Sequence, residues 1–399
     1  MSHSSVVAAP FSLHPALSST PRGHQTRDND LLPQRTYGVR EKMLLQLHGQ
    51  KIRIPDLGRL MEDWPRDQNP HLDAVDSKIL QIIESHAVND AVRGRLTKAM
   101  LSKQLTGWYP YASCDRIEAL TSFQAWMFIV DDMLDQYSLI HKFDFASLHV
   151  LLADCRDFID RSLGLLTLCT SETGQPQYRD YDAVVSFAEY AEAVMKANGD
   201  NYSYRQRIAK EATATLDGYR QEAVNRYAGR ATSLQEYLGY REASSCIMQV
   251  AVNLEFANGI SLPEEVMASP EMRELYRAAV AIVWIVNDIV SLRKELKEGF
   301  VENLVVLLAN GDAQKGLDGA VTRLEHEVSA LNDAVKASAR RFDDTPYKNH
   351  VTLLAKNCKN MCMANWLWSM KTPRYCLSDI KPDAEGGYTF TVDSTSEES

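Results

Sequence analysis

The sequence is short of the features that mark several common protein classes. Its seven cysteines are scattered and never spaced as CxxC, so neither a disulfide framework nor a zinc site is indicated, and we expect reduced thiols. With 19 glycines and 14 prolines in 399 residues, turns are sparse. This composition disfavours a β-sandwich and favours an all-α protein.

Positive charge and long apolar runs are also lacking. Lys and Arg number 43 against 53 Asp and Glu, a formal charge of -10, which has the wrong sign for a nucleic-acid-binding surface. The longest apolar run, AAVAIVWIV at 278–286, has nine residues, about half of the roughly 18 that suggest a membrane span. No secretory signal is recognisable at the start. We expect no nucleic-acid partner, no transmembrane segment and a cytoplasmic location.

The chain has three parts by composition. Residues 1–41 are rich in Ser, Pro, His and Arg without a hydrophobic period, and residues 385–399 are acidic and rich in small residues, so both are predicted to be flexible tails. Between them, apolar residues recur at helical spacing in long blocks such as 72–88 and 275–296. Because no repeat or long linker divides this region, a single helical domain is predicted for 42–384.

The stretch FIVDDMLDQ, residues 128–136, places three carboxylates on an apolar helix. Asp131 and Asp135 are four residues apart and share a face, while Asp132 lies about 100° round the helix from Asp131. A buried carboxylate without a partner costs several kcal/mol, so this segment needs cations unless it turns its acidic end to water. Oxygen ligands of this kind favour Mg²⁺.

A second polar motif, NDIVSLRKE at 287–295, directly follows the long apolar run. Asn287, Ser291 and Glu295 are spaced i, i+4 and i+8, drifting about 40° per step, so an amide, a hydroxyl and a carboxylate line one stripe. Lys294 lies on the same face and adds a cation, which suits an anionic ligand. The other Asn-Asp pairs, at 29, 89 and 332, lack this spacing. Oxygen-only ligands again suit Mg²⁺.

The two motifs together resemble the aspartate-rich and NSE metal motifs of class I terpene synthases, of the fungal or bacterial type with a single α domain. The family's diphosphate-sensing arginine lies 46 positions before the NSE asparagine, which is Arg241 here. The family also ends its catalytic domain with an Arg-Tyr pair after a helix of the type N-x-x-W-S. This chain reads NWLWSMKTPRY, with Asn365, Trp368, Arg374 and Tyr375.

The resemblance implies an all-α, single-domain class I terpenoid synthase bundle around a central active-site cavity. It implies Mg²⁺-dependent ionisation of a prenyl diphosphate with three ions. One side would bind metal through Asp131 with Asp135, and the other through Asn287, Ser291 and Glu295. The diphosphate would be bound by Arg241, Lys294, Arg374 and Tyr375, while Asp132 orients Arg374.

A cavity that guides carbocations should be apolar and aromatic, because ring faces stabilise cations. Phe128, Tyr219 and Trp368 are the candidates, and ordinary core packing is the alternative for each of them. The chain departs from many relatives just after the sensor arginine, where they break the helix with Gly and this chain has Ala-Ser-Ser at 243–245. Which group there senses ionisation stays open.

Several alternatives follow from the same residues. A chain-elongating prenyltransferase would carry two aspartate-rich motifs, and the NSE motif argues against it. A non-catalytic helical binding protein would not release diphosphate. Farnesyl diphosphate is the expected substrate and a polycyclic hydrocarbon or alcohol the expected product, with geranyl and geranylgeranyl diphosphates left open. The overall sequence resembles those of fungal presilphiperfolanol-type cyclases. One sequence does not give the carbon skeleton of the product, the capture of water or the oligomeric state.

Overall fold

The computed structural model of this protein describes residues 38–86, 90–139, 145–166 and 184–393, all within the unit Arg35–Ser399. Helices dominate these residues, which confirms the predicted all-α class. The longer helices are α1 (Val39–Leu47), α2 (Leu72–His86), α3 (Asp90–Lys98), α4 (Leu101–Trp108), α5 (Cys114–Leu139), α6 (Phe145–Ser162), α8 (Ala188–Asn198), α9 (Tyr202–Tyr227), α10 (Leu234–Ser244), α11 (Ile247–Asn258), α13 (Pro270–Lys297), α15 (Ala313–Phe342) and α16 (Lys348–Ser369). The shorter ones are α12 (Glu264–Met267), α14 (Leu304–Ala309), η2 (Leu57–Met61) and η3 (Pro373–Tyr375).

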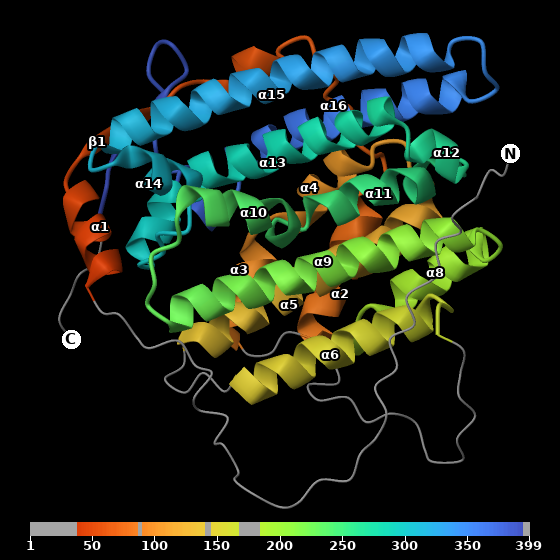
Figure 1. Cartoon of the computed structure of the whole chain (residues 1–399), viewed down its shortest axis with the longest axis horizontal. Helices are drawn as coiled ribbons and strands as arrows, with labels where there is room; N and C mark the ends of the chain where they lie inside the picture. The colour runs from red at the N-terminus through yellow and green to blue at the C-terminus, as the bar shows by residue number, and fades with distance from the viewer. Residues whose placement is uncertain (1–37, 87–89, 140–144, 167–183, 394–399) are drawn as a thin grey trace, which may run out of the picture. The chain divides into compact units, whose positions relative to one another are not determined.

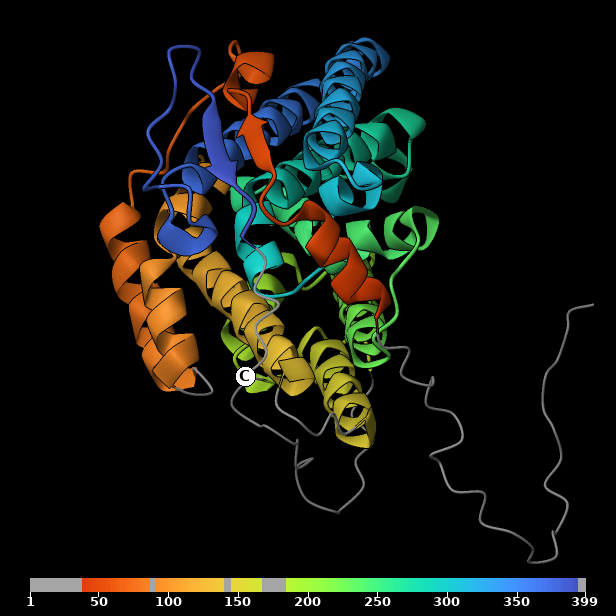
Figure 2. The same cartoon turned by 90° about the vertical axis from the view of Figure 1, so that its left-hand side faces the viewer.

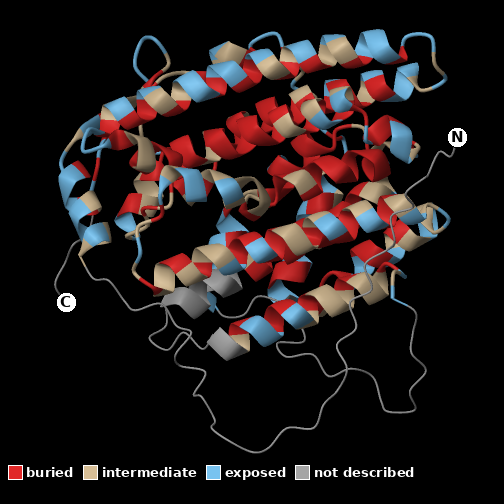
Figure 3. Ribbon diagram, in the orientation of Figure 1, coloured by how far each residue is buried: buried red, intermediate tan, exposed pale blue. Residues whose placement is uncertain are grey.

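Helix α13 is largely buried and runs through the middle of the bundle (Figures 1 and 3). Ser269 caps it by accepting a hydrogen bond from the Met272 N–H, and Pro270 fits the first turn, which has no donor to lose. It packs against α10, α11, α14, α15 and α16. By length and composition α13 could cross a membrane, but 89% of its most apolar 18-residue window is buried in the protein, as expected for a core helix.

The junction between α10 and α11 is a sharp break that lies beside the cavity described below. Only Ser245 and Cys246 separate the two helices, and Cys246 has a φ of 62°, in the left-handed region. A side chain in this region costs about 1 kcal/mol relative to glycine. The chain therefore makes the break that relatives often make with Gly, but with a cysteine at the strained position.

Strands β1 (Lys51–Ile54) and β2 (Tyr388–Thr391) form an antiparallel ribbon (Figure 2). Ile52 lies opposite Phe390, both are buried, and Arg53 pairs with Asp383 at 2.6 Å. This differs from the flexible tail predicted from residue 385 onward. The physical reason is that YTFT alternates aromatic and β-branched residues, which form a strand once KIRI supplies a partner.

The predicted N-terminal tail also needs a correction at its end. Helix α1 begins at Val39, inside the region 1–41 that was expected to be a tail, and it buries Leu44 and Leu47. Residues 1–37 and 394–399 lie outside the described residues, so the rest of both predicted tails is not described. The cysteine prediction agrees with the structure for the six described cysteines, which are all free, and four of them are buried.

Candidate active site

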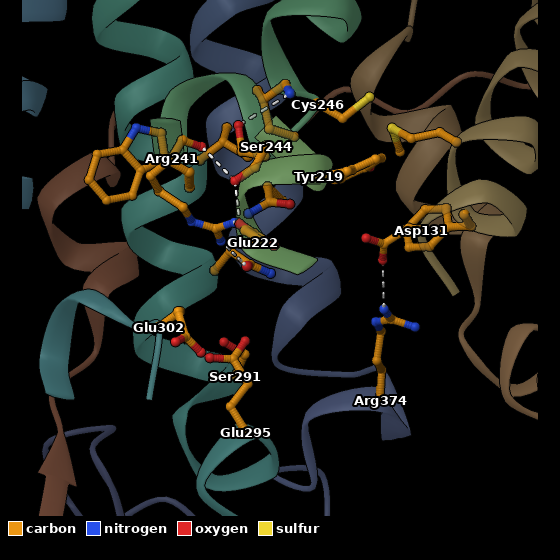
Figure 4. A pocket seen from close by; sticks show the side chains of 18 of the residues that line it. Asp131, Tyr219, Glu222, Arg241, Ser244, Cys246, Ser291, Glu295, Glu302 and Arg374 are labelled. Carbon is orange, nitrogen blue, oxygen red and sulfur yellow. Dashed lines mark hydrogen bonds and ion pairs between the residues drawn. The ribbon is translucent and has the colours of Figure 1, made fainter. Parts of the chain in front are cut away.

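A cavity of about 1070 Å³, counted with its open mouth, lies between α13 and the helices that face it (Figure 4). Its walls come from α4, α5, α9, α10, α11, α13, α16 and η3, and from the segment after α13. Many lining side chains are aromatic or aliphatic, namely Trp108, Met127, Phe128, Tyr219, Ile247, Val283, Trp284 and Phe300. The remaining ones are mostly charged or polar, so the cavity combines an apolar surface with a set of ionic groups.

Side chains of the second sequence motif line the cavity from α13. Asn287, Ser291 and Glu295 are brought together there, in agreement with the stripe that their spacing predicts. The Ser291 hydroxyl is near enough to Glu295 to lower the pKa of that carboxyl, yet it has no well-formed hydrogen bond with any described residue. A buried polar atom without a partner costs about 1–3 kcal/mol, which a ligand at Ser291 would relieve.

Glu295 is held in an environment that opposes its charge. Burial raises the pKa of its carboxyl above the usual value, and the negative charge of Asp288 raises it further. A hydrogen bond from Asn303 Nδ2 to Glu295 Oε2, 2.9 Å long, acts in the opposite direction. A cation bound at Glu295 would stabilise the ionised carboxylate and so offset the effects of burial and of the Asp288 charge.

Arg241 joins α10 to the same stretch of α13. Its Nε and Nη2 donate to Asp288 Oδ1 at 3.0 and 2.7 Å, and its Nη2 also donates to Asn287 Oδ1 at 2.8 Å. Asp288 is buried and accepts further hydrogen bonds from the Tyr237 hydroxyl and the Leu304 N–H. Burial lowers the pKa of the Arg241 guanidinium, but the nearby carboxylates, Asp288 first, raise it well above its usual value. Arg241 therefore stays charged and contacts the Asn287 oxygen that a metal would use.

The wall opposite α13 carries the first sequence motif. Asp131 lines the cavity on α5, and its Oδ2 lies 3.9 Å from Arg374 Nη2 (Figure 4). The Arg374 guanidinium also stands over the Phe128 ring, 5.2 Å from the ring centre. The side chains of Asp132 and Asp135 lie outside the described residues, so the predicted roles of both are not described.

The Arg-Tyr pair reaches the cavity through Tyr375 as well. Its hydroxyl accepts a hydrogen bond of 2.8 Å from Asn287 Nδ2, and burial raises its pKa to about 12, so it stays protonated and able to donate. Trp368, predicted as a cavity aromatic, is not among the lining residues. It packs edge-on against the Tyr375 ring at 5.6 Å and donates its indole N–H to the Ala99 carbonyl at 2.9 Å.

Two other predicted residues lie at the cavity. Lys294 lines it, and its Nζ lies 3.4 Å from Glu298 Oε2 on the next turn of α13. Tyr219 lines it from α9 and is buried. The helix break contributes Ser244, Ser245 and Cys246, so the position where the chain departs from its relatives lies in the cavity wall.

A group of ionic residues was missed by the sequence reasoning. Glu222 and Arg226, one turn apart on α9, pair at 3.1 Å, and Glu222 also accepts a hydrogen bond from the Ser244 hydroxyl. Glu302 lines the cavity and binds Arg40 of α1 through two hydrogen bonds. The only local signal was the i, i+4 spacing of Glu222 and Arg226, which an ordinary exposed helix pair also shows.

The residues present fit a divalent metal. Asn287, Ser291 and Glu295 offer oxygen atoms from an amide, a hydroxyl and a carboxylate, the donors that hard cations prefer, and the Ser291 oxygen has no well-formed hydrogen bond in the described part. Within that part, no three His, Cys, Asp or Glu side chains gather closely enough to form a metal cluster.

Comparisons with known proteins place the chain among terpene cyclases. The sesquiterpene cyclase hepA of Aspergillus oryzae is 23% identical over 375 residues, covering 89% of this chain and 97% of the relative. Pristinol synthase of Streptomyces pristinaespiralis is 27% identical over 342 residues, covering 81% and 84%. A solved structure of linalool/nerolidol synthase from Streptomyces clavuligerus, in complex with 2-fluorogeranyl diphosphate, superposes with a TM-score of 0.61 at 18% identity, covering 78% of this chain and 98% of that one.

The family match is the most specific of these findings. The family described as terpene synthase family 2, C-terminal metal binding, matches residues 122–334, which is more than half of the chain. That range contains both predicted metal motifs and Arg241. The resemblance to class I sesquiterpene cyclases noted in the sequence is thereby confirmed, and the chain belongs to terpene synthase family 2 as a metal-binding terpene cyclase.

Proposed function

We propose that the protein is a Mg²⁺-dependent sesquiterpene cyclase that ionises farnesyl diphosphate, cyclises the allylic cation to a polycyclic hydrocarbon or alcohol and releases diphosphate. The observation that carries this proposal is one cavity in which Asn287, Ser291 and Glu295 face Asp131 and Arg374 across an aromatic interior. A prenyl diphosphate has the same division, with an anionic group at one end and a hydrocarbon chain at the other.

The ionic residues have distinct roles in this proposal. Three Mg²⁺ ions would be bound in total, one by Asn287, Ser291 and Glu295 and the others by Asp131 with Asp135. Bound Mg²⁺ neutralises the charge that grows on the diphosphate as the carbon–oxygen bond breaks. Arg241, Lys294, Arg374 and Tyr375 donate hydrogen bonds to the diphosphate oxygens, while Asp132 orients Arg374.

Arg241 has a specific task at the first step. In the described state its Nη2 binds Asn287 Oδ1 at 2.8 Å, it donates further hydrogen bonds to Asp288, and its Nη1 lies 3.9 Å from Glu222 Oε1. Diphosphate oxygens compete for the same guanidinium N–H groups. A shift of Arg241 toward the diphosphate frees the Asn287 oxygen for a cation, so binding of the two ligands is coupled.

The hydrocarbon chain then folds against the apolar lining. Phe128 and Tyr219 line the cavity, and aromatic ring faces stabilise cationic carbons by about 0.5–2 kcal/mol each. Phe128 also carries the Arg374 guanidinium, so it links the diphosphate end to the hydrocarbon end. Trp368 acts through Tyr375, against which it packs.

The choice of a fifteen-carbon substrate is supported by relatives rather than by a single contact. One of them, hepA, is a sesquiterpene cyclase, whereas the linalool/nerolidol synthase was solved with 2-fluorogeranyl diphosphate, an analogue of a ten-carbon substrate. Geranyl and geranylgeranyl diphosphates are the alternatives to test.

The experiment is to incubate the purified chain separately with geranyl, farnesyl and geranylgeranyl diphosphate, with Mg²⁺ and with EDTA, and to analyse extracts by gas chromatography and mass spectrometry. We expect a cyclic C15 product from farnesyl diphosphate only when Mg²⁺ is present. Longer linear diphosphates, detected after phosphatase treatment, would mean chain elongation. No turnover of any substrate would favour a binding protein on the same scaffold.

A further inference from the structure

The segment that follows α13 folds back onto the helix that carries the predicted metal ligands. Gly299 has a φ of 80°, which lets the chain reverse after the last helical turn, and the Phe300 N–H then donates to the Glu295 carbonyl at 2.8 Å. Four residues later the Leu304 N–H donates to Asp288 Oδ2 at 2.9 Å. The segment is therefore tied to α13 at both of its ends.

Asn303 lies in this reversed segment, and both the oxygen and the nitrogen of its side-chain amide make hydrogen bonds. Its Oδ1 accepts a hydrogen bond of 2.9 Å from the Val305 N–H and so caps α14. Its Nδ2 donates to two acceptors on α13, the Asp288 carbonyl at 2.7 Å and Glu295 Oε2 at 2.9 Å. Asn303 is 0% exposed, so it cannot itself reach a ligand in the cavity.

We propose that Asn303 is the positioning residue for Glu295: it fixes one carboxylate oxygen against the backbone of α13 and leaves the other for the metal. This inference rests on the proposed function, in which Glu295 is a metal ligand. A glutamate has three side-chain torsions, and a ligand that must meet Asn287 and Ser291 at one ion needs them fixed. Residues that orient metal ligands in this way typically change metal affinity by about 10–100-fold when they are replaced.

The competing explanation is that Asn303 only caps α14. The two roles use different atoms, because the cap needs Oδ1 and the positioning needs Nδ2. Asn303→Asp retains the capping oxygen, since Asp and Asn cap helices about equally well. The same change replaces the donor with a carboxylate oxygen that repels Glu295. Asn303→Ser retains a capping oxygen as well and removes the donor without adding charge.

Asn201 supplies a matched control. It caps α9 through its Oδ1, which accepts from the Tyr204 N–H at 3.0 Å, and its Nδ2 donates to the Ser261 hydroxyl at 2.8 Å. It does not line the cavity. Asn201→Asp thus makes the same chemical change at a helix cap, with the same loss of a donor, but without a predicted metal ligand as partner.

The measurement is the calorimetric titration of the full-length chain with MgCl₂ in the presence of inorganic diphosphate, followed by the Mg²⁺ dependence of farnesyl diphosphate turnover. We expect Asn303→Asp and Asn303→Ser to raise the Mg²⁺ concentration for half-saturation by about 10–100-fold. Asn201→Asp should match the unaltered chain. At saturating Mg²⁺ the KM for farnesyl diphosphate should change little.

Two results would overturn the inference. The first is a folded Asn303→Ser or Asn303→Asp variant that binds Mg²⁺ within about two-fold of the unaltered chain. The second comes from a Glu295→Ala background, which removes the partner of Asn303, so that the effect of Asn303→Ser on the weakened metal binding should disappear; an undiminished effect would mean that Asn303 acts through something other than Glu295. If the unaltered chain neither binds Mg²⁺ with diphosphate nor turns over a prenyl diphosphate, the proposed function itself fails.

Discussion

The two walls of the cavity hold their ionic side chains in different ways. On the α13 wall the Asn287 amide is engaged at both ends, by Arg241 and Tyr375 at 2.8 Å each, and Glu295 is bound by Asn303 at 2.9 Å. On the α5 wall Asp131 is 32% exposed and its ion pair with Arg374 measures 3.9 Å, near the limit for such pairs. Among the contacts described, those of the α13 side chains are short hydrogen bonds, whereas that of Asp131 with Arg374 is a long ion pair.

The largest effect is expected from breaking the α13 wall. Asn287→Ala or Glu295→Ala should reduce turnover of farnesyl diphosphate by about 10³-fold or more, because each removes a metal ligand and a hydrogen-bond partner from a fixed network. Helix content by circular dichroism should be unchanged. The control is Asn332→Ala, which changes the asparagine of another Asn-Asp pair, on α15 and outside this cavity. Undiminished activity in either variant would refute the metal assignment.

A smaller loss is expected on the α5 wall. Asp131→Asn should lower kcat/KM by about 10²-fold, since it weakens metal binding and the contact with Arg374 together. If this wall is completed by ligands, Asp131→Asn should weaken Mg²⁺ binding when diphosphate is present and leave it nearly unchanged when diphosphate is absent. Equal weakening in both conditions, measured by calorimetry, would show that the two walls are equally preformed.

Two aromatic substitutions distinguish a residue that lines the cavity from one that supports a neighbouring side chain. Phe128→Leu should change the product ratio several-fold with little loss of rate, because the ring lines the cavity. Trp368→Phe should lower kcat by about ten-fold or less and leave the ratio unchanged, because the ring supports Tyr375 from behind. Gas chromatography of the products is the measurement. A changed ratio in Trp368→Phe would return that residue to the group that contacts the hydrocarbon.

The smallest effect concerns stability. Glu295 has a pKa raised above its usual 4.5, so its ionised form at pH 7 is less stable in the folded protein than in the unfolded chain. Glu295→Gln removes this penalty and still accepts from Asn303, so the metal-free Tm should rise by about 2 °C at pH 7. The gain should shrink as the pH falls toward 4.5, and Mg²⁺ with diphosphate should no longer stabilise the variant. A lower Tm for the variant at pH 7 would contradict the claim that ionised Glu295 destabilises the metal-free folded protein.

Residues that interact along one helix could be predicted from the sequence. The stripe of Asn287, Ser291 and Glu295 needed only the helical repeat, and the buried course of α13 followed from its apolar run. Arg241 and Tyr375 were assigned by resemblance, and the structure brings both to Asn287. The α13 stripe follows from the helical repeat, and the contacts of Arg241 and Tyr375 follow from the family motifs to which these residues belong.

What could not be predicted depends on contacts between distant segments. Glu302 is bound by Arg40, 262 positions away, and neither residue belongs to a pattern. The role of Asn303 appears only when the chain reverses after α13. Trp368 was predicted to line the cavity because it lies seven residues before Tyr375. Sequence spacing does not show on which side of the Tyr375 ring the Trp368 ring packs, and it packs on the side away from the cavity lining.

The ribbon of β1 and β2 has a consequence for how the enzyme is made. Lys51 pairs with Thr391, so the first strand has no partner until residue 391 has been made. Helices α2 to α16 precede β2 in the chain and can pack before the ribbon closes. The segment between α16 and β2 also carries Arg374 and Tyr375. A chain that stops before these two residues therefore lacks two side chains of the cavity wall, whatever the rest of the bundle has formed.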